Sequence, residues 1–236
     1  MNTNFSAFQH TGSLTRVNAF IRSTYNWMAV GLALTGVTSY FVSTSPAFLQ
    51  AVYGNAIMPF VLMIGLFILC GFLGARINRM QASTATGLYA MLTVLYGICL
   101  APIFLMYTAS SIASTFFICA ATFGAASVYG MVTKKDLTSM GQFMMMGLMG
   151  IIIAIIVNIF IQSSMMNTII SMIAVIIFTG LTAYDTQKLR SMAVTLPDNA
   201  TGAMVRKGAI MGALSLYLDF MGLFVYLLNL LGVSRD

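Results

Sequence analysis

The chain has very little charge, and this shortage excludes a water-soluble domain. Only 7% of its 236 residues are Asp, Glu, Lys or Arg, and glutamate is absent altogether. A soluble domain of this size carries roughly a quarter charged residues, which it needs to cover its surface in water. Hydrophobic residues instead make up 59% of the chain, and the mean hydropathy is +0.93. The composition therefore predicts a membrane protein.

Residues that carry common chemistries are also scarce. The single histidine, His10, lies in a polar N-terminal stretch, which argues against Ser–His catalysis inside a membrane. No HExxH, glycine-rich phosphate loop or CxxC motif occurs, and three cysteines give no disulfide framework. Although the net charge is +6, the basic residues are scattered rather than clustered with aromatics, so we expect no nucleic-acid partner. We expect no enzymatic activity and no cofactor.

What the chain has in abundance is long apolar runs. These runs are continuous, without the alternation of barrel strands, and each approaches the ~20 residues that a helix needs to cross hydrocarbon. We predict an all-α integral membrane protein with seven transmembrane helices near 25–42, 57–75, 86–107, 111–132, 142–161, 169–186 and 209–233. Pro102 should kink the third span. Residues 1–22 are predicted to form a polar cytoplasmic tail, and 23–236 a single seven-helix membrane domain.

The basic residues predict the orientation of the chain. The loops at 43–56, 108–110 and 162–168 contain no Lys or Arg, whereas the N-terminus and the alternate loops carry ten basic residues. Cytoplasmic loops are enriched in Lys and Arg, so we expect the N-terminus to be cytoplasmic. The side of the C-terminus stays open: seven full crossings would place it outside, and a re-entrant last segment would return it to the cytoplasm.

Two of the five aspartates lie inside predicted spans. Asp185 is near the cytoplasmic end of the sixth span, and Asp219 is flanked on both sides by apolar residues of the seventh. A carboxylate at the centre of a membrane helix costs about 2.5–3.5 kcal/mol to insert, so such residues usually face a bundle interior. Consecutive spans are antiparallel, so Asp185 and Asp219 can approach each other. Their depths match imperfectly unless the seventh span begins near Leu214.

Two nearby carboxylates support two kinds of chemistry. In a low-dielectric site they share a proton more readily than both ionise, which makes a pH sensor. Both ionised, they form an oxygen site for a hard cation such as Ca²⁺, to which Thr182 and Ser215 could add hydroxyl ligands from the same helix faces. The simpler alternative is that each aspartate only bonds a neighbouring helix or an arginine. Arg76 and Arg79 are the natural ion-pair partners in either case.

Two intramembrane aspartates are also found in intramembrane aspartyl proteases. Those enzymes pair a Tyr-Asp with a Gly-x-Gly-Asp motif. This chain has Tyr184 before Asp185 but lacks the glycines before Asp219, which argues against that class.

Longer motifs resemble one known family. The segments 179–189 (TGLTAYDTQKL) and 213–228 (ALSLYLDFMGLFVYLL), with 107–116 (YTASSIASTF) and 129–137 (YGMVTKKDL), closely resemble the Bax inhibitor family. The resemblance covers nearly the whole chain after the polar tail and is strongest to the bacterial inner-membrane branch. One departure is Phe220-Met221-Gly222, where the family commonly has an Ile-Asn pair after the aspartate.

The resemblance implies a fold and a function. The fold would be six helices surrounding a central C-terminal helix, in the bacterial inner membrane. Asp185 and Asp219 would sense pH and control a calcium leak, and Arg76 or Arg79 would latch one of them in a closed state. The alternative is a non-conducting regulatory protein that binds a membrane protease or another membrane partner in a stress response. Beyond lipid, the expected ligands are Ca²⁺ and protons.

Overall fold

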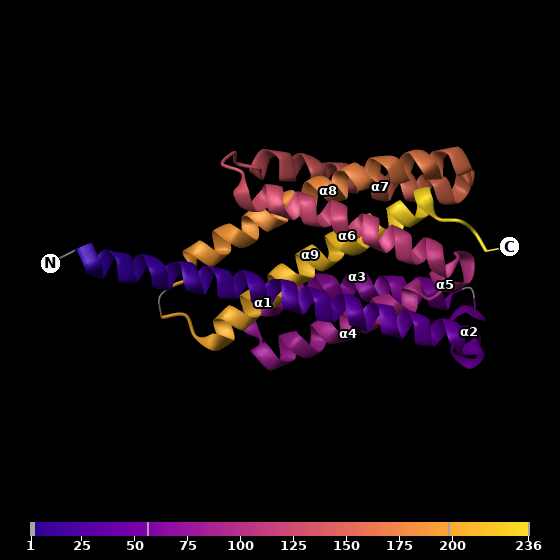
Figure 1. Ribbon diagram of the computed structural model, residues 1–236. Coiled ribbons are helices and arrows are strands. Elements are labelled where there is room, and N and C mark those ends of the chain that lie inside the picture. The colour runs from indigo at the N-terminus through magenta and orange to yellow at the C-terminus, as the bar shows by residue number, and fades with distance from the viewer. Residues whose placement is uncertain (1–2, 56, 198, 236) are drawn as a thin grey trace. The chain divides into compact units, whose positions relative to one another are not determined.

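The computed structural model is helical over nearly its whole length (Figure 1). It describes residues 3–55, 57–197 and 199–235, with side chains from residue 16 onward except that of residue 78. The helices are α1 (Thr3–Thr44), α2 (Pro46–Tyr53), α3 (Met58–Arg76), η1 (Ile77–Arg79), α4 (Ala82–Leu100), α5 (Ile103–Met106), α6 (Ala109–Val132), α7 (Thr138–Ile161), α8 (Ser164–Thr195) and α9 (Gly202–Leu231).

The prediction of seven membrane-spanning helices is confirmed. Within the described residues, seven segments are long and apolar enough to cross a bilayer: Arg16–Thr44, Met58–Arg76, Ala82–Met106, Ala109–Val132, Thr138–Ile161, Ser164–Thr195 and Gly202–Leu231. The last two extend well beyond their predicted cytoplasmic ends, because polar residues can continue a helix outside hydrocarbon. The last span is one unbroken helix of 30 residues, about 45 Å long, so the broken or re-entrant alternative does not describe it.

The predicted kink at Pro102 is present as a break between α4 and α5. Proline has no backbone N–H and cannot continue the helical hydrogen-bond ladder. The chain passes the break through two shorter-range bonds, from Ala101 N to the Ile98 carbonyl and from Phe104 N to the Ala101 carbonyl, each 3.2 Å long. The two helices together still make one span.

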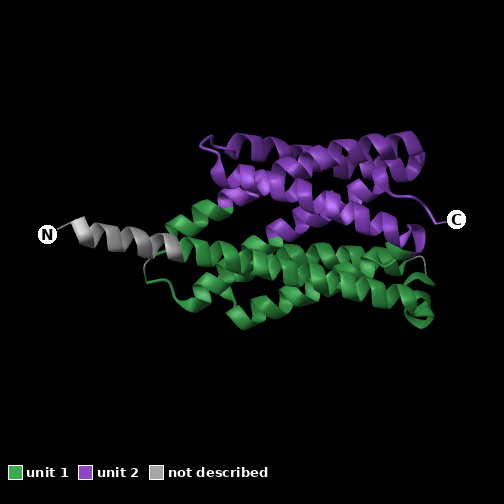
Figure 2. Cartoon of the chain, viewed as in Figure 1, with its two compact units in different colours: residues 1–104, 189–214 green, residues 105–188, 215–236 purple. Residues whose placement is uncertain are grey.

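The chain forms two compact units (Figure 2). The first comprises residues 1–104 and 189–214, and the second comprises residues 105–188 and 215–236. The division falls inside the continuous helices α8 and α9. Of the seven spans, α9 has the largest buried share, 56% of its most apolar stretch, against 33% or less in the others. The arrangement of six helices around this one stays a prediction.

Hydrogen bonds between α1 and α4 tie the first unit together. Tyr89 donates its hydroxyl to the carbonyl of Trp27 at 3.0 Å, and Thr35 donates to the carbonyl of Thr93 at 2.9 Å. At the Thr35 level the backbones come close, because a Cβ at Gly97 would lie 2.6 Å from the Thr35 carbonyl oxygen. These buried contacts satisfy polar groups that lipid could not.

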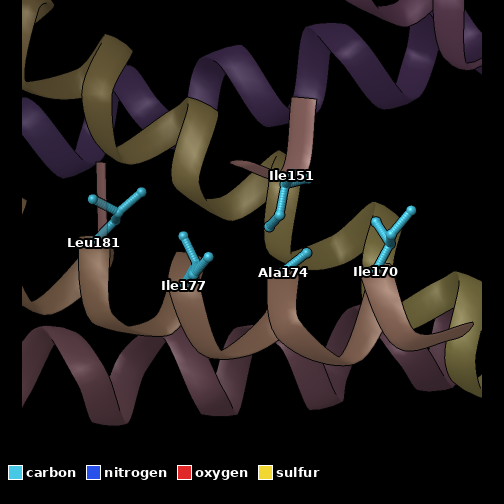
Figure 3. Close-up of a cluster of buried hydrophobic side chains, with 5 residues drawn as sticks. All are labelled: Ile151, Ile170, Ala174, Ile177 and Leu181. Carbon is cyan, nitrogen blue, oxygen red and sulfur yellow. The ribbon is translucent and has the colours of Figure 1, made fainter. Parts of the chain in front are cut away.

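The second unit is built from α6, α7, the first part of α8 and the last part of α9. Its apolar core includes one row of side chains from α8 that meets Ile151 of α7 (Figure 3). The α8 members recur every three or four residues, as expected for one face of a helix: Ile170, Ala174, Ile177 and Leu181. This packing holds α8 in place beside α7.

Candidate functional site

The contacts between α8 and α9 in the second unit fix how these two helices align. The ring of Phe178 in α8 stacks on the ring of Tyr226 in α9, with centroids 5.9 Å apart and an interplanar angle of 24°. The same ring lies against Gly222, where an added Cβ would come within 2.7 Å of Cε2. Further along, Asn167 donates to Asn229 at 3.1 Å. The helices are therefore antiparallel and locked in a defined register.

This register brings the two intramembrane aspartates together. Asp185 lies seven residues after Phe178, and Asp219 lies seven residues before Tyr226. Seven residues are almost two full helical turns, so each aspartate returns to the face that its aromatic residue occupies. The charge of Asp185 accordingly acts on the carboxyl group of Asp219. The mismatch in depth expected from the sequence disappears, because the two helices pair by register rather than by their ends.

Burial distinguishes the two carboxyl groups. Asp219 is only 6% exposed, and its Oδ2 has no hydrogen-bond partner in the described part of the chain. Asp185 is partly buried, and its carboxyl group interacts electrostatically with the positive charge of Lys188. Lys188 lies three residues later, on the exposed side of α8. Buried polar atoms are nearly always hydrogen-bonded, and intramembrane carboxylates are usually functional. The orphaned oxygen of Asp219 therefore marks this pair as the candidate site.

The two predicted supporting hydroxyls differ in position. Ser215 lies seven residues before Gly222, so the Phe178–Gly222 contact places it across from Asp185 in the same register. Thr182 is fully buried and donates its hydroxyl to the Phe178 carbonyl of its own helix at 2.8 Å. The register thus brings Ser215 to the pair, whereas the hydroxyl hydrogen of Thr182 is already in use.

The two candidate latch residues belong to the first unit. Arg76 ends α3 with its guanidinium carbon 5.9 Å from the centroid of the Phe72 ring, and Arg79 lies in η1. Both side chains are exposed. The pairing of either arginine with an aspartate of the second unit stays a prediction.

Polar contacts that the sequence did not single out surround Asp185. Its neighbour Thr186 donates to Ser127 of α6 at 3.4 Å. Gln187 accepts from the backbone N–H of Leu137 at 2.9 Å and donates to the Lys135 carbonyl at 2.8 Å. These bonds fasten α6 and the α6–α7 connection to α8 next to the aspartate. In the sequence, these contacts are indicated only by the two consecutive polar residues, Thr186 and Gln187, that directly follow Asp185.

The pair can hold a proton or bind a hard cation weakly. Among the described residues there is no cluster of three or more His, Cys, Asp or Glu side chains. Calcium takes six to eight oxygen ligands, and two carboxylates supply at most four. The remaining ligands would come from Ser215, backbone carbonyls or water. This donor set suits an ion that enters and leaves, not a permanently bound one.

Comparisons with known proteins agree with these motifs. The model of the family described as inhibitor of apoptosis-promoting Bax1 matches residues 17–236, almost the entire chain. This chain belongs to the Bax inhibitor family. The inner membrane protein YbhL of Escherichia coli is 40% identical over 219 residues, with 93% of each chain covered. Protein RP147 of Rickettsia prowazekii is 43% identical, with 92% of this chain and 90% of that protein covered.

Membership of the Bax inhibitor family also settles the location. A relative named as an inner membrane protein, together with seven spans, makes this chain a multi-pass inner membrane protein. A protein from Borreliella burgdorferi is 39% identical over 93% of this chain and 94% of its own length. The Bax inhibitor motifs at 179–189 and 213–228 contain the two aspartates that the α8–α9 register brings together.

Proposed function

We propose that this protein is a non-enzymatic, pH-sensitive leak channel for Ca²⁺, gated by Asp185 and Asp219. The observation that carries the proposal is a buried, unpartnered carboxylate oxygen of Asp219 in a helix register that faces Asp185. The resemblance of the surrounding motifs to the Bax inhibitor family supports the same assignment.

The chemistry follows from the protonation state of the pair. Two unit charges 4 Å apart repel by about 4 kcal/mol at an effective dielectric constant of about 20. With both carboxylates ionised, this repulsion is relieved by a cation or by separation of α8 from α9. With one proton shared, the carboxyl groups hydrogen-bond, their mutual repulsion is gone, and the pair carries one negative charge instead of two. Uptake of one proton therefore changes both the attraction for Ca²⁺ and the contact between the helices.

The test is Ca²⁺ flux into dye-loaded proteoliposomes over a range of about pH 6 to 8, where a coupled carboxyl pair can titrate. Wild type is compared with Asp185→Asn and Asp219→Asn, because a carboxamide keeps the shape of the side chain and cannot titrate. We expect wild-type flux to depend on pH and either substitution to flatten that dependence.

Asp136→Asn is the matched control. Asp136 lies outside the spans, and Thr138 donates to its carboxylate from both the backbone N–H, at 2.9 Å, and the hydroxyl, at 2.6 Å. These bonds lower the pKa of Asp136, so it stays ionised throughout the assay and its replacement should leave the pH response intact.

Two results would overturn the proposal. One is flux no greater than that of empty liposomes while the protein remains folded, which would favour a non-conducting partner for a membrane protease or another membrane protein. The other is a pH response that survives both aspartate substitutions.

A further inference from the structure

The packed face of α6 carries a row of small polar side chains. Ser111, Thr115, Cys119 and Ser127 are all buried and recur at multiples of four residues. The row spans sixteen residues, or about 24 Å of helix. Phe123 occupies the one position in this series that is not polar, between Cys119 and Ser127.

Among the described residues of the second unit, two buried side-chain oxygen atoms lack hydrogen-bond partners, and one of them belongs to this row. Ser111 accepts from the backbone N–H of Val233 at 2.9 Å. Thr115, by contrast, is 1% exposed and its hydroxyl has no partner among the residues described. The other orphan is Oδ2 of Asp219. Unsatisfied atoms buried at membrane depth are where water or a cation would be held.

An aromatic layer of Phe116, Phe123 and Phe220 packs beside these two groups. The Phe220 ring packs edge-on against Phe123, with centroids 5.4 Å apart, and against Phe116 at 5.5 Å. Phe220 directly follows Asp219, and the backbone carbonyl of Phe220 accepts from the Cys119 thiol at 3.6 Å.

The polarity of the helices assigns a side to each group. The contacts pair Phe123 with Phe220 and Ser111 with Val233, so α6 and α9 are antiparallel. Asp219 consequently lies toward the Ser127 end of α6 from Phe220, and Thr115 lies toward the other end from Phe116.

We propose that Phe116, Phe123 and Phe220 form the hydrophobic gate of a cation path that runs along α6 from the aspartate pair to Thr115. This inference rests on the proposed channel function and adds its route and its barrier. Apolar constrictions stop ions by excluding the water that must accompany them. Because Phe220 is adjacent to Asp219 on α9, a rotation or shift of α9 when the pair changes protonation moves the gate directly.

The path is tested with Thr115→Val. Valine has the shape of threonine, and removing a hydroxyl that has no partner should not weaken the fold. At the pH where wild-type Ca²⁺ flux is highest (the open pH), we expect the flux to fall by about tenfold, which corresponds to ~1.4 kcal/mol on the barrier. The matched control is Thr122→Val on the same helix, whose hydroxyl donates to the carbonyl of Ile118 at 2.9 Å. This control should conduct like wild type.

The gate is tested with Phe123→Ala. At the pH where wild-type Ca²⁺ flux is lowest (the closed pH), this substitution should raise the flux toward the wild-type value at the open pH. Phe160→Ala, at a side chain that is 83% exposed on α7, should not. A second measurement uses the thiol of Cys119 next to Phe220, after replacement of Cys70 and Cys99 by alanine. A water-soluble thiol reagent should label Cys119 in Phe123→Ala protein and spare it in the closed wild-type gate.

The outcomes separate the gate from the channel. If wild type conducts with the expected pH response but Thr115→Val conducts equally well, the path is wrong. If folded Phe123→Ala neither leaks nor exposes Cys119, the gate is wrong. If wild type never conducts, the channel function fails. Labelling of Cys119 in Phe123→Ala but not in wild type would still show that the aromatic layer excludes water. Equal labelling of Cys119 in the two proteins would overturn the layer as well.

Discussion

The alignment of α8 and α9 makes a sharp prediction for Gly222→Ala. The new methyl group would overlap the ring of Phe178, lying 2.7 Å from Cε2. Movement of the ring away from the methyl group would disturb its stack on Tyr226, and this stack is one of the contacts that set the register. A single methyl group should therefore disturb the alignment that brings Asp185 to Asp219.

The expected cost follows from two opposing effects. Overpacking a closely packed site costs about 1–3 kcal/mol. Replacing glycine by alanine within a helix returns about 1 kcal/mol. Gly222→Ala should thus lower the free energy of unfolding by about 0–2 kcal/mol. Gly124→Ala on α6 is the control, because no described residue outside its own stretch of helix comes within 4 Å of its would-be Cβ, and it should raise that free energy by about 1 kcal/mol.

Thermal unfolding of both variants in one detergent measures the difference. Repeating Gly222→Ala in a Phe178→Ala background removes the clash, so the penalty should vanish there, as a double-mutant cycle requires. The pH response of Ca²⁺ flux should shift in Gly222→Ala and stay unchanged in Gly124→Ala. Equal stabilisation by the two alanines would refute the contact, and with it the register that pairs the aspartates.

Three further predictions concern the surroundings of the pair. Gly130→Ala should cost more than Gly222→Ala, because its methyl group would meet the backbone carbonyl of Ala183, which cannot rotate away; the yield and melting temperature of folded protein measure this. Gln187→Ala should speed amide hydrogen exchange at Leu137, since that N–H loses its acceptor, and unchanged exchange would exclude the anchoring role. The pKa of Asp136 is lowered in the folded state, so its hydrogen bonds contribute stability above the unfolded pKa of about 4. This contribution is lost as the pH falls through the folded pKa. Melting curves of wild type and Asp136→Asn should therefore differ at neutral pH and converge in acid.

The spans were predictable because the signal is simple. A run of about twenty apolar residues has few alternatives to a membrane helix, and proline in the interior of a helix breaks or kinks it. The C-terminal end of α8 and the N-terminal end of α9 were not predictable in the same way. Thr195 and Gly202 bound these helices outside the apolar runs, where the hydrocarbon no longer dictates where a helix stops.

Glycine spacing shows a second limit of sequence reasoning. Gly124 stands four residues after Ala120, the small-residue spacing that favours close helix contacts, yet no neighbouring helix in the described part of the chain comes within 4 Å of its would-be Cβ. Gly130, on the same helix, meets the α8 backbone at Ala183. Both glycines lie in apolar sequence, so only the three-dimensional packing reveals which of them a helix approaches.

The difference between Asp219 and Thr115 explains why one orphan could be found from sequence and the other could not. An aspartate in a membrane helix stands out whatever its surroundings, because its charge is costly everywhere in hydrocarbon. A threonine carries no such signal, since its hydroxyl can donate to a carbonyl of its own helix, as Thr122 and Thr182 do. Only the structure shows that Thr115 makes no such bond. With this second unpartnered atom, the proposed path runs from the acidic pair past the aromatic layer to Thr115.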